Sequence, residues 1–204
     1  MNNSGDDGEP AAAGWRSAAD AELLAAAARR DRAAFAEIAG RYYRPVYRLA
    51  WRMTGGHADS EDIAQEAFVR LWRNPGQLRE AAALKGWLMR VAANGAIDRA
   101  RRRQAAALDD APEPADERPP ADRVLERREA QRHIDRAIAA LPERQRLALS
   151  LVHFEGLTNI EAAAAMQASV DAVESLLARA RRGLKERLSG EWRELLDGLG
   201  AGSG

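Results

Sequence analysis

The stretch TNIEAAAAMQASVDAVESLLARARRGLKERL, residues 158–188, decides the fold of the C-terminal half. Thr158 and Glu161 form the T-x-x-E pattern of a capping box, which starts a helix ahead of an alanine run. Ser169 is a typical N-cap for a second, longer helix after a short turn. Two helices in this order predict a helix-turn-helix, whose second helix can enter the major groove of DNA.

The second helix should have two distinct faces. Its apolar side chains recur at helical spacing and predict a buried face, made of Val170, Val173, Leu177, Ala180, Leu184 and Leu188. The candidate DNA-contacting residues start at its N-cap and continue along the opposite face: Ser169, Asp171, Glu174, Ser175, Arg179 and Arg182. An ordinary helical hairpin with a solvated charged face explains this stretch equally well.

Composition favours an all-helical protein. The 204 residues are dominated by good helix formers, and apolar alternation at period two is missing. The absence of cysteine excludes disulfides and thiolate metal sites. Neither a signal peptide nor a membrane-spanning segment is visible, so we expect a cytoplasmic protein without membrane insertion of its own.

The charges balance, because Lys plus Arg and Asp plus Glu both number 31. A protein that binds DNA alone usually carries excess positive charge, so autonomous DNA binding is disfavoured. A subunit that reaches DNA on a larger, basic partner remains compatible with this balance. The three histidines are scattered, and no metal-ligand or phosphate-loop spacing appears, so an enzyme, a cofactor and a metal site are not expected.

Changes in composition along the chain predict two small helical domains. Residues 1–18 are polar and glycine-rich and are interpreted as a disordered tail, and residues 19–103 carry the first helical pattern. Residues 104–122 are acidic and rich in proline, which predicts a flexible linker. Residues 123–190 form the helix-turn-helix domain, and residues 191–204 form a second tail.

Cap residues and breakers divide the first domain. Asp20, Asp31 and Asp59 are predicted N-caps of successive helices. Pro45 removes one helix hydrogen bond and should kink or divide the second of them. We assign the tryptophans Trp51, Trp72 and Trp87 mainly to packing.

Two motif sets in series resemble bacterial RNA polymerase sigma factors of the extracytoplasmic-function (ECF) type. ALPERQRLALSLVHFEGLTNIEAAAAMQASVDAVESLLARARRGLKERL resembles the C-terminal domain of that family. DSEDIAQEAFVRLWR resembles its acidic helix, and GWLMRVAANGAIDRARR resembles its promoter-melting helix. The resemblance covers roughly residues 20–103 and 123–188, in the family's order.

The resemblance implies a function in promoter-specific transcription initiation. It implies that an acidic helix docks on the clamp of the largest subunit of core RNA polymerase through Asp59, Glu61, Asp62, Gln65 and Glu66. A capped, solvated helix face explains these acids nearly as well. It also implies that a loop and the following helix hold a flipped base of the minus-ten element and its flanking phosphates, through Leu78, Arg79, Asn94, Arg99, Arg101, Arg102 and Arg103.

By the same resemblance, the helix-turn-helix reads the minus-thirty-five element and an anti-sigma factor holds the chain inactive. The linker would occupy the RNA-exit path of the polymerase, although a simple spacer explains it as well. Three positions depart from the family. Gln167 stands where the turn usually has glycine, and Asp171 and Glu174 stand where the recognition helix is usually not acidic.

Two other functions are compatible with parts of the pattern. A sigma-mimicking protein that binds an anti-sigma factor would tolerate the acids of the recognition helix, but it has no use for the basic run at residues 99–103. A dimeric helix-turn-helix regulator conflicts with the neutral net charge and the N-terminal half. A sigma factor remains the reading that uses both halves.

Overall fold

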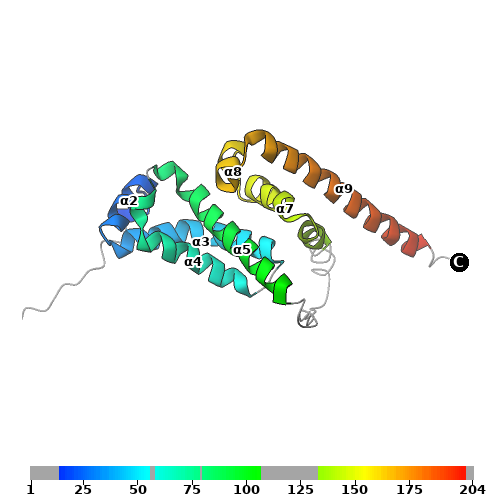
Figure 1. Cartoon of the computed structure of the whole chain (residues 1–204), viewed down its shortest axis with the longest axis horizontal. Coiled ribbons are helices and arrows are strands. Elements are labelled where there is room, and N and C mark those ends of the chain that lie inside the picture. Colours follow the sequence, from blue (N-terminus) through cyan, green and yellow to red (C-terminus); the bar gives the residue numbers. More distant parts are fainter. Residues whose placement is uncertain (1–13, 56–57, 79, 107–132, 201–204) are drawn as a thin grey trace, which may run out of the picture.

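The structure is a computed structural model that describes residues 14–55, 58–78, 80–106 and 133–200 (Figure 1). Within these ranges all regular elements are helices, as the composition predicts. The N-terminal domain contains α2 (Asp20–Ala28), α3 (Arg32–Thr54), α4 (Asp59–Arg73), the short helices η1 (Pro75–Gln77) and η2 (Ala81–Ala83), and α5 (Leu84–Ala106). The C-terminal domain contains α7 (Glu143–Leu149), the π-helix η3 (Ser150–Phe154), α8 (Asn159–Met166) and α9 (Val170–Gly200).

The N-terminal domain is built on the mutual packing of α3, α4 and α5, with α2 against α3. Each of these helices turns an apolar stripe inward, which is why the periodicity of the sequence predicts them. Ile38, Leu49, Ile63, Leu71 and Leu88 are at most 1% exposed. This core fixes α4 and α5 side by side, so their polar faces share one surface.

Only one of the three aspartate caps of this domain is formed as predicted. The Asp31 carboxylate accepts hydrogen bonds from the backbone N–H groups that begin α3. Asp20 and Asp59 instead lie in the first turns of their helices, because Ala19 and Ala58 are the N-caps. Both carboxylates instead form ion pairs with arginines from other helices, Asp20 with Arg41 and Asp59 with Arg103.

Helix α3 runs unbroken through Pro45. Of the two predicted effects of this proline, a kink or a division, division is therefore wrong. The helix buries Val46 and Leu49 immediately after the proline, and this tertiary packing offsets the missing hydrogen bond. The helix ends at Gly55, whose φ of 72° lies in the left-handed region that favours glycine.

The domain limits differ from the predicted ones at both ends. Residues 14–15 are helical and residues 16–17 form a turn. Arg41 donates hydrogen bonds to the carbonyls of Trp15 and Arg16, which ties this part of the expected tail to α3. Helix α5 continues to Ala106, past the expected start of the linker, and α9 continues to Gly200. The rest of the expected linker, and residues 123–132 of the second domain, lie outside the described residues.

The two domains pack against each other, with α8 lying on α5 (Figure 1). Buried residues of α5, η3 and α8 belong to one apolar cluster, to which Leu88, Leu151 and Ala162 contribute.

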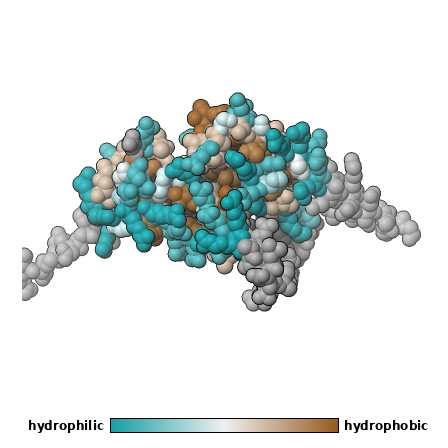
Figure 2. Space-filling model, in the orientation of Figure 1, coloured by the Kyte–Doolittle hydropathy of each residue, from teal (hydrophilic) through white to brown (hydrophobic). Residues whose placement is uncertain are grey.

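Figure 2 shows a mostly hydrophilic face, with hydrophobic residues gathered toward its middle. Among the described residues, none of the helices has the length and apolarity that a bilayer crossing requires.

Candidate nucleic-acid interface

The helix-turn-helix begins with the predicted capping box. The Thr158 hydroxyl accepts from the backbone N–H of Glu161 at 3.2 Å, and the Glu161 carboxylate accepts from the backbone N–H of Thr158 at 2.7 Å. The Glu161 carboxylate also accepts a 2.8 Å hydrogen bond from the Thr158 hydroxyl. The backbone bond to the carboxylate, and after it this hydroxyl bond, lower the pKa of Glu161. Lys85 of the other domain lowers this pKa further through its charge. The start of α8 is therefore fixed by local sequence.

The turn between α8 and α9 adopts the conformation that favours glycine. Gln167 has φ 51° and ψ 49°, the left-handed region, and the backbone N–H of Ala168 closes the turn on the Ala163 carbonyl at 3.0 Å. Ser169 then caps α9 by accepting from the backbone N–H of Ala172 at 3.2 Å. The predicted helix-turn-helix is present, with a strained residue where glycine would be relaxed.

Helix α9 has the two predicted faces. Val173, Leu177 and Ala180 are at most 3% exposed. Three outer members of the predicted buried face, Val170, Leu184 and Leu188, are only half-buried, because they lie toward the ends of the packed segment. The candidate DNA-contacting residues are all exposed: Ser169, Asp171, Glu174, Ser175, Arg179 and Arg182.

The acidic surface of α4 is divided into two parts. Glu61, Asp62 and Gln65 are exposed, and Gln65 donates to Glu61 at 3.4 Å. Asp59 and Glu66 are half-buried against α5. The part of α4 that can meet a partner directly is therefore smaller than the sequence pattern predicts.

The basic run at the end of α5 pairs with those two acids. Arg103 forms an ion pair with Asp59, and Arg99 lies 3.7 Å from the Glu66 carboxylate, which also pairs with Arg70 within α4. Arg101 and Arg102 are exposed. Two of the four arginines predicted to hold phosphates are thus partly neutralised inside the domain.

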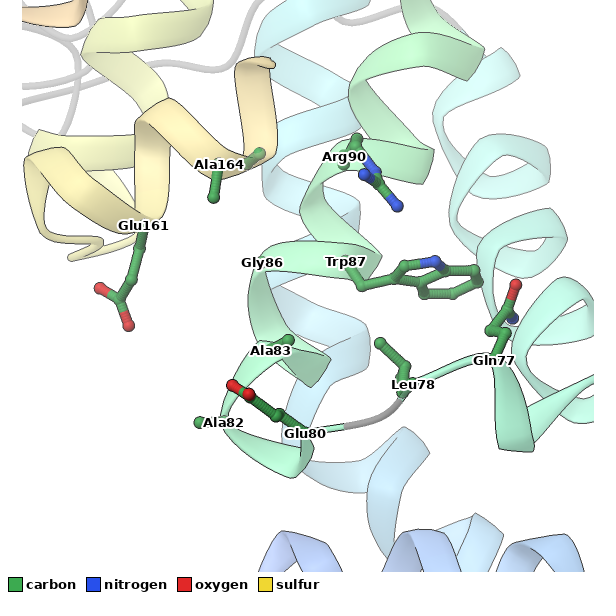
Figure 3. Close-up of a pocket in the computed structure, with 11 residues that line it drawn as sticks. Gln77, Leu78, Glu80, Ala82, Ala83, Gly86, Trp87, Arg90, Glu161 and Ala164 are labelled. Atoms are coloured by element: carbon green, nitrogen blue, oxygen red, sulfur yellow. The ribbon is translucent and has the colours of Figure 1, made fainter. Parts of the chain in front are cut away.

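A cavity of about 370 Å³ lies beside the loop that joins α4 to α5. Gln77, Leu78 and Glu80 line it from the loop, and Trp87 and Arg90 line it from α5. Figure 3 shows the Trp87 indole beside Leu78 and Gln77, with Arg90 one turn further along α5. An aromatic face, an apolar wall and a guanidinium are the groups that can hold an unstacked base.

The lining of this cavity and the residue set predicted for a flipped base overlap only in part. Leu78 lies on it, whereas Asn94 is exposed on α5 and is not part of its lining. Arg79 lies outside the described residues. Gln77 and Arg90 also line the cavity, and the sequence prediction does not include them. Trp87, assigned mainly to packing, both packs on the core and lines the cavity. The three-residue spacing of Trp87 and Arg90 indicates from the sequence that both side chains lie on the same face of a helix.

The other two tryptophans have different environments. Trp72 packs on Phe35 with 4.8 Å between ring centroids, and the Arg30 guanidinium lies over it, so its assignment to packing is confirmed. Trp51 is 46% exposed, and its ring lies 6.1 Å from that of Tyr47, so it packs against α3 only in part. Within the described ranges no group of His, Asp or Glu side chains is arranged as a metal site.

The two domains match two family models in chain order. Residues 38–106 match Sigma-70 region 2, and residues 131–184 match Sigma-70, region 4. The acid-bearing α4 and the loop and α5 residues of the cavity lie within the first match. The helix-turn-helix, whose α8 also lines the cavity, begins within the second.

Curated relatives and solved structures agree with these matches. The chain is 35% identical to the ECF RNA polymerase sigma factor SigM of Mycobacterium tuberculosis, over 83% of this chain and 84% of that protein. It is 31% identical to SigW of Bacillus subtilis, over 78% of this chain and 90% of that protein.

CnrH, solved in complex with the cytosolic domain of CnrY, superposes with a TM-score of 0.65 and 26% identity, over 85% of this chain and 99% of that one. RpoE of Bartonella quintana, at 22% identity and a TM-score of 0.63, shares the fold over 76% of this chain and 96% of its own. With region 2 and region 4 matched in order and relatives above 30% identity along most of its length, this chain belongs to the ECF RNA polymerase sigma factors.

Proposed function

We propose that this chain binds core RNA polymerase, directs it to a set of promoters and helps to open the DNA there, without being an enzyme itself. The observation that carries the proposal is the arrangement of an acid-bearing helix, a base-sized cavity and a helix-turn-helix in the order of Sigma-70 regions 2 and 4. We place this activity in the cytoplasm, where promoter DNA and the polymerase are found.

The polymerase contact is assigned to α4. Glu61, Asp62 and Gln65 are exposed and can meet a basic partner directly, and complementary charge would steer the encounter. Asp59 and Glu66 complete the acidic set but share their charge with arginines of α5. We propose the clamp of the largest polymerase subunit as the partner.

The minus-ten contact is assigned to the cavity and the end of α5. A base flipped from the melted strand would stack on Trp87 against Leu78, with Arg90 close to its edge or phosphate. Asn94, Arg99, Arg101, Arg102 and Arg103 continue along the same helix and would bind neighbouring nucleotides. Arg99 and Arg103 would have to exchange their carboxylates for phosphates to do so.

The minus-thirty-five contact is assigned to the exposed face of α9. Ser175 and Arg179 lie one turn apart on this face, where side chains reach base edges and phosphates. Arg182 continues the row, and Ser169 offers the helix N-terminus. Asp171 and Glu174 cannot hold phosphates, so they would act by discriminating between bases.

Regulation by an anti-sigma factor is part of the proposal. RpoE of Bartonella quintana, which shares this fold, is solved in complex with the anti-sigma factor NepR. We propose that a protein of that kind also restrains this chain. The signal that frees this chain would then act on the anti-sigma factor.

Transcription in vitro tests the proposed function. Purified chain is added to core RNA polymerase with a library of promoter fragments, and the transcripts are sequenced. We expect initiation at a defined subset that core polymerase alone does not use. Failure to associate with core polymerase contradicts the proposal, and association without initiation supports the sigma-mimicking alternative, for which the exposed Asp171 and Glu174 are the favourable observation.

A further inference from the structure

Glu155 is a buried carboxylate at the boundary between the two domains. It follows the π-helix η3, where the Glu155 N–H donates to the Ser150 carbonyl at 3.0 Å, and it precedes Gly156 with φ 67°. Its side chain is only 1% exposed. A buried carboxylate requires charged or hydrogen-bonding partners, and π-helical turns are frequent where a protein needs an unusual local geometry.

Within the part of the chain that the structure describes, the cationic partners of Glu155 come from the other domain. Arg48 and Arg52 of α3 donate to its carboxylate at 3.0 Å and 2.7 Å. Lys85 of α5 donates to its main-chain carbonyl at 2.6 Å. The Arg52 guanidinium also lies 4.1 Å from the ring centroid of Phe154. Because Arg48 lies on α3 and Glu155 lies in the other domain, this cluster exists only when the domains are together.

The same packing places α8 over the candidate minus-ten cavity. Glu161, Ala164 and Ala165 of α8 line the cavity opposite the loop residues. Figure 3 shows Glu161 and Ala164 on a separate helix across the opening from Trp87. A DNA strand that enters here would meet α8 and the negative charge of Glu161, so occupation by DNA and this packing compete.

Promoter geometry also requires the domains to separate. The minus-ten and minus-thirty-five elements lie about 25 base pairs apart, which is roughly 85 Å at 3.4 Å per base pair. A cavity that touches α8 cannot serve one element while α9 reads the other. The chain between Ala106 and His133 is long enough, at roughly 3.3 Å per extended residue, for the domains to part.

The cluster of Glu155, Arg48, Arg52 and Lys85 is suited to a reversible contact between the two domains. Breaking a buried ion pair by removing one partner leaves an uncompensated charge, whereas domain separation returns every charge to water. Arg48 is already 48% exposed in its side chain, so its rehydration on opening is easy. The ion pairs therefore stabilise one packed arrangement of the two domains, and the domains can still separate.

We propose that Glu155 is an intramolecular latch, which holds the helix-turn-helix domain on Arg48, Arg52 and Lys85 and thereby covers the minus-ten cavity until the chain opens. The latch itself rests on the observed contacts alone. Only its consequence for DNA rests on the function proposed above.

Fluorescence energy transfer tests the latch directly. The sequence contains no cysteine, so dyes can be placed at Ala36→Cys on α3 and Ala178→Cys on α9, both exposed positions. We expect the free chain to occupy mainly a high-transfer state, and Glu155→Gln to reduce that population several-fold. Unchanged transfer in Glu155→Gln, with circular dichroism showing a folded protein, overturns the proposal.

Further variants separate the latch from general stability. Arg52→Gln removes the contact from the other domain and should open the chain as Glu155→Gln does, which keeps the test valid if one variant misfolds. Glu37→Gln is the matched control, because Glu37 pairs with Arg41 within α3, and it should leave transfer unchanged. The charge swap Arg52→Glu with Glu155→Arg should restore part of the closed population. A swap that stays as open as the single variants argues against a direct ionic contact.

A last measurement joins the latch to transcription. If opening limits assembly, the apparent affinity of the chain for core polymerase on promoter DNA should rise in Glu155→Gln by the same factor as the open fraction. An unchanged affinity despite an opened chain overturns the claim that closure blocks DNA. Failure of the parent chain to bind polymerase refutes the proposed function instead, and the transfer experiment then judges the latch by itself.

Discussion

Asn159 at the start of α8 donates a hydrogen bond to Glu174 on the exposed face of α9, with 3.3 Å between Nδ2 and Oε1. The contact spans the turn of the helix-turn-helix and holds an acid where a recognition helix meets DNA. A carboxylate can accept from the amino group of cytosine but repels phosphate. The acidic position is therefore oriented by its neighbour rather than left as a random surface charge.

Glu174 should contribute to selectivity in the minus-thirty-five element. We expect Glu174→Ala to shift preference away from sites that present a cytosine amino group, by about 1–3 kcal/mol at one base pair. Transcription from a library randomised in this element measures the shift. Asn159→Ala keeps the carboxylate and removes only the hydrogen bond that orients it, so its shift should be smaller than that of Glu174→Ala. An unchanged preference in Glu174→Ala would remove this role.

The left-handed Gln167 should be a site of avoidable strain. Glycine adopts this conformation without a Cβ penalty, so Gln167→Gly should raise the free energy of unfolding by about 1 kcal/mol. Denaturant titration of the full chain, followed by helical circular dichroism, measures the change. Gln167→Ala keeps the Cβ and should show no such gain. Equal stability of the glycine and alanine variants would contradict the explanation.

The capping box should make the start of α8 sensitive to acid. Hydrogen bonds from Thr158 hold the pKa of Glu161 below its unfolded value, which is about 4.3. This stabilisation is present above the unfolded pKa and is lost as pH falls through the folded one. Glu161→Gln keeps a capping amide without the charge, so its stability deficit at neutral pH should shrink at about pH 3. Denaturant titrations at both pH values test this, and a constant deficit would argue against it.

Exposed and paired acids of α4 should differ in their effect on polymerase binding. Asp62→Asn should weaken association roughly three- to ten-fold at low salt, or about 1 kcal/mol, and the loss should fade as salt screens the charge. Asp59→Asn should cost less, because Arg103 already partly neutralises that carboxylate. Binding of labelled chain to core polymerase at several salt concentrations compares the two variants. Equal losses would show that the ion pair opens in the complex.

Trp87 should supply stacking for a minus-ten base. Trp87→Leu keeps an apolar side chain against the core but removes the aromatic face, which is worth about 1–3 kcal/mol for one stacked base. Open-complex formation at a minus-ten element, followed by permanganate reactivity of unpaired thymines, should fall accordingly. Trp72→Leu is the control, because Trp72 packs on Phe35 and does not line the cavity. Similar defects in both variants would indicate a packing effect.

Local sequence determined the helices and their order. Thr158, Ser169 and Asp31 act as caps, because a cap needs only a side chain and the backbone groups of the next turn. The buried stripe of α9 is equally local, since helical spacing alone brings Val173, Leu177 and Ala180 to one face. The two-domain order followed from the same patterns.

The tertiary structure alone decided which charges are available and which surfaces are covered. Asp59 looked like a cap and Arg103 like a phosphate ligand until the packing of α4 on α5 joined them. Glu155 carried no signal in the sequence, because its arginines lie on a helix of the other domain. Such pairings depend on where distant helices come together, and no short-range pattern encodes that distance.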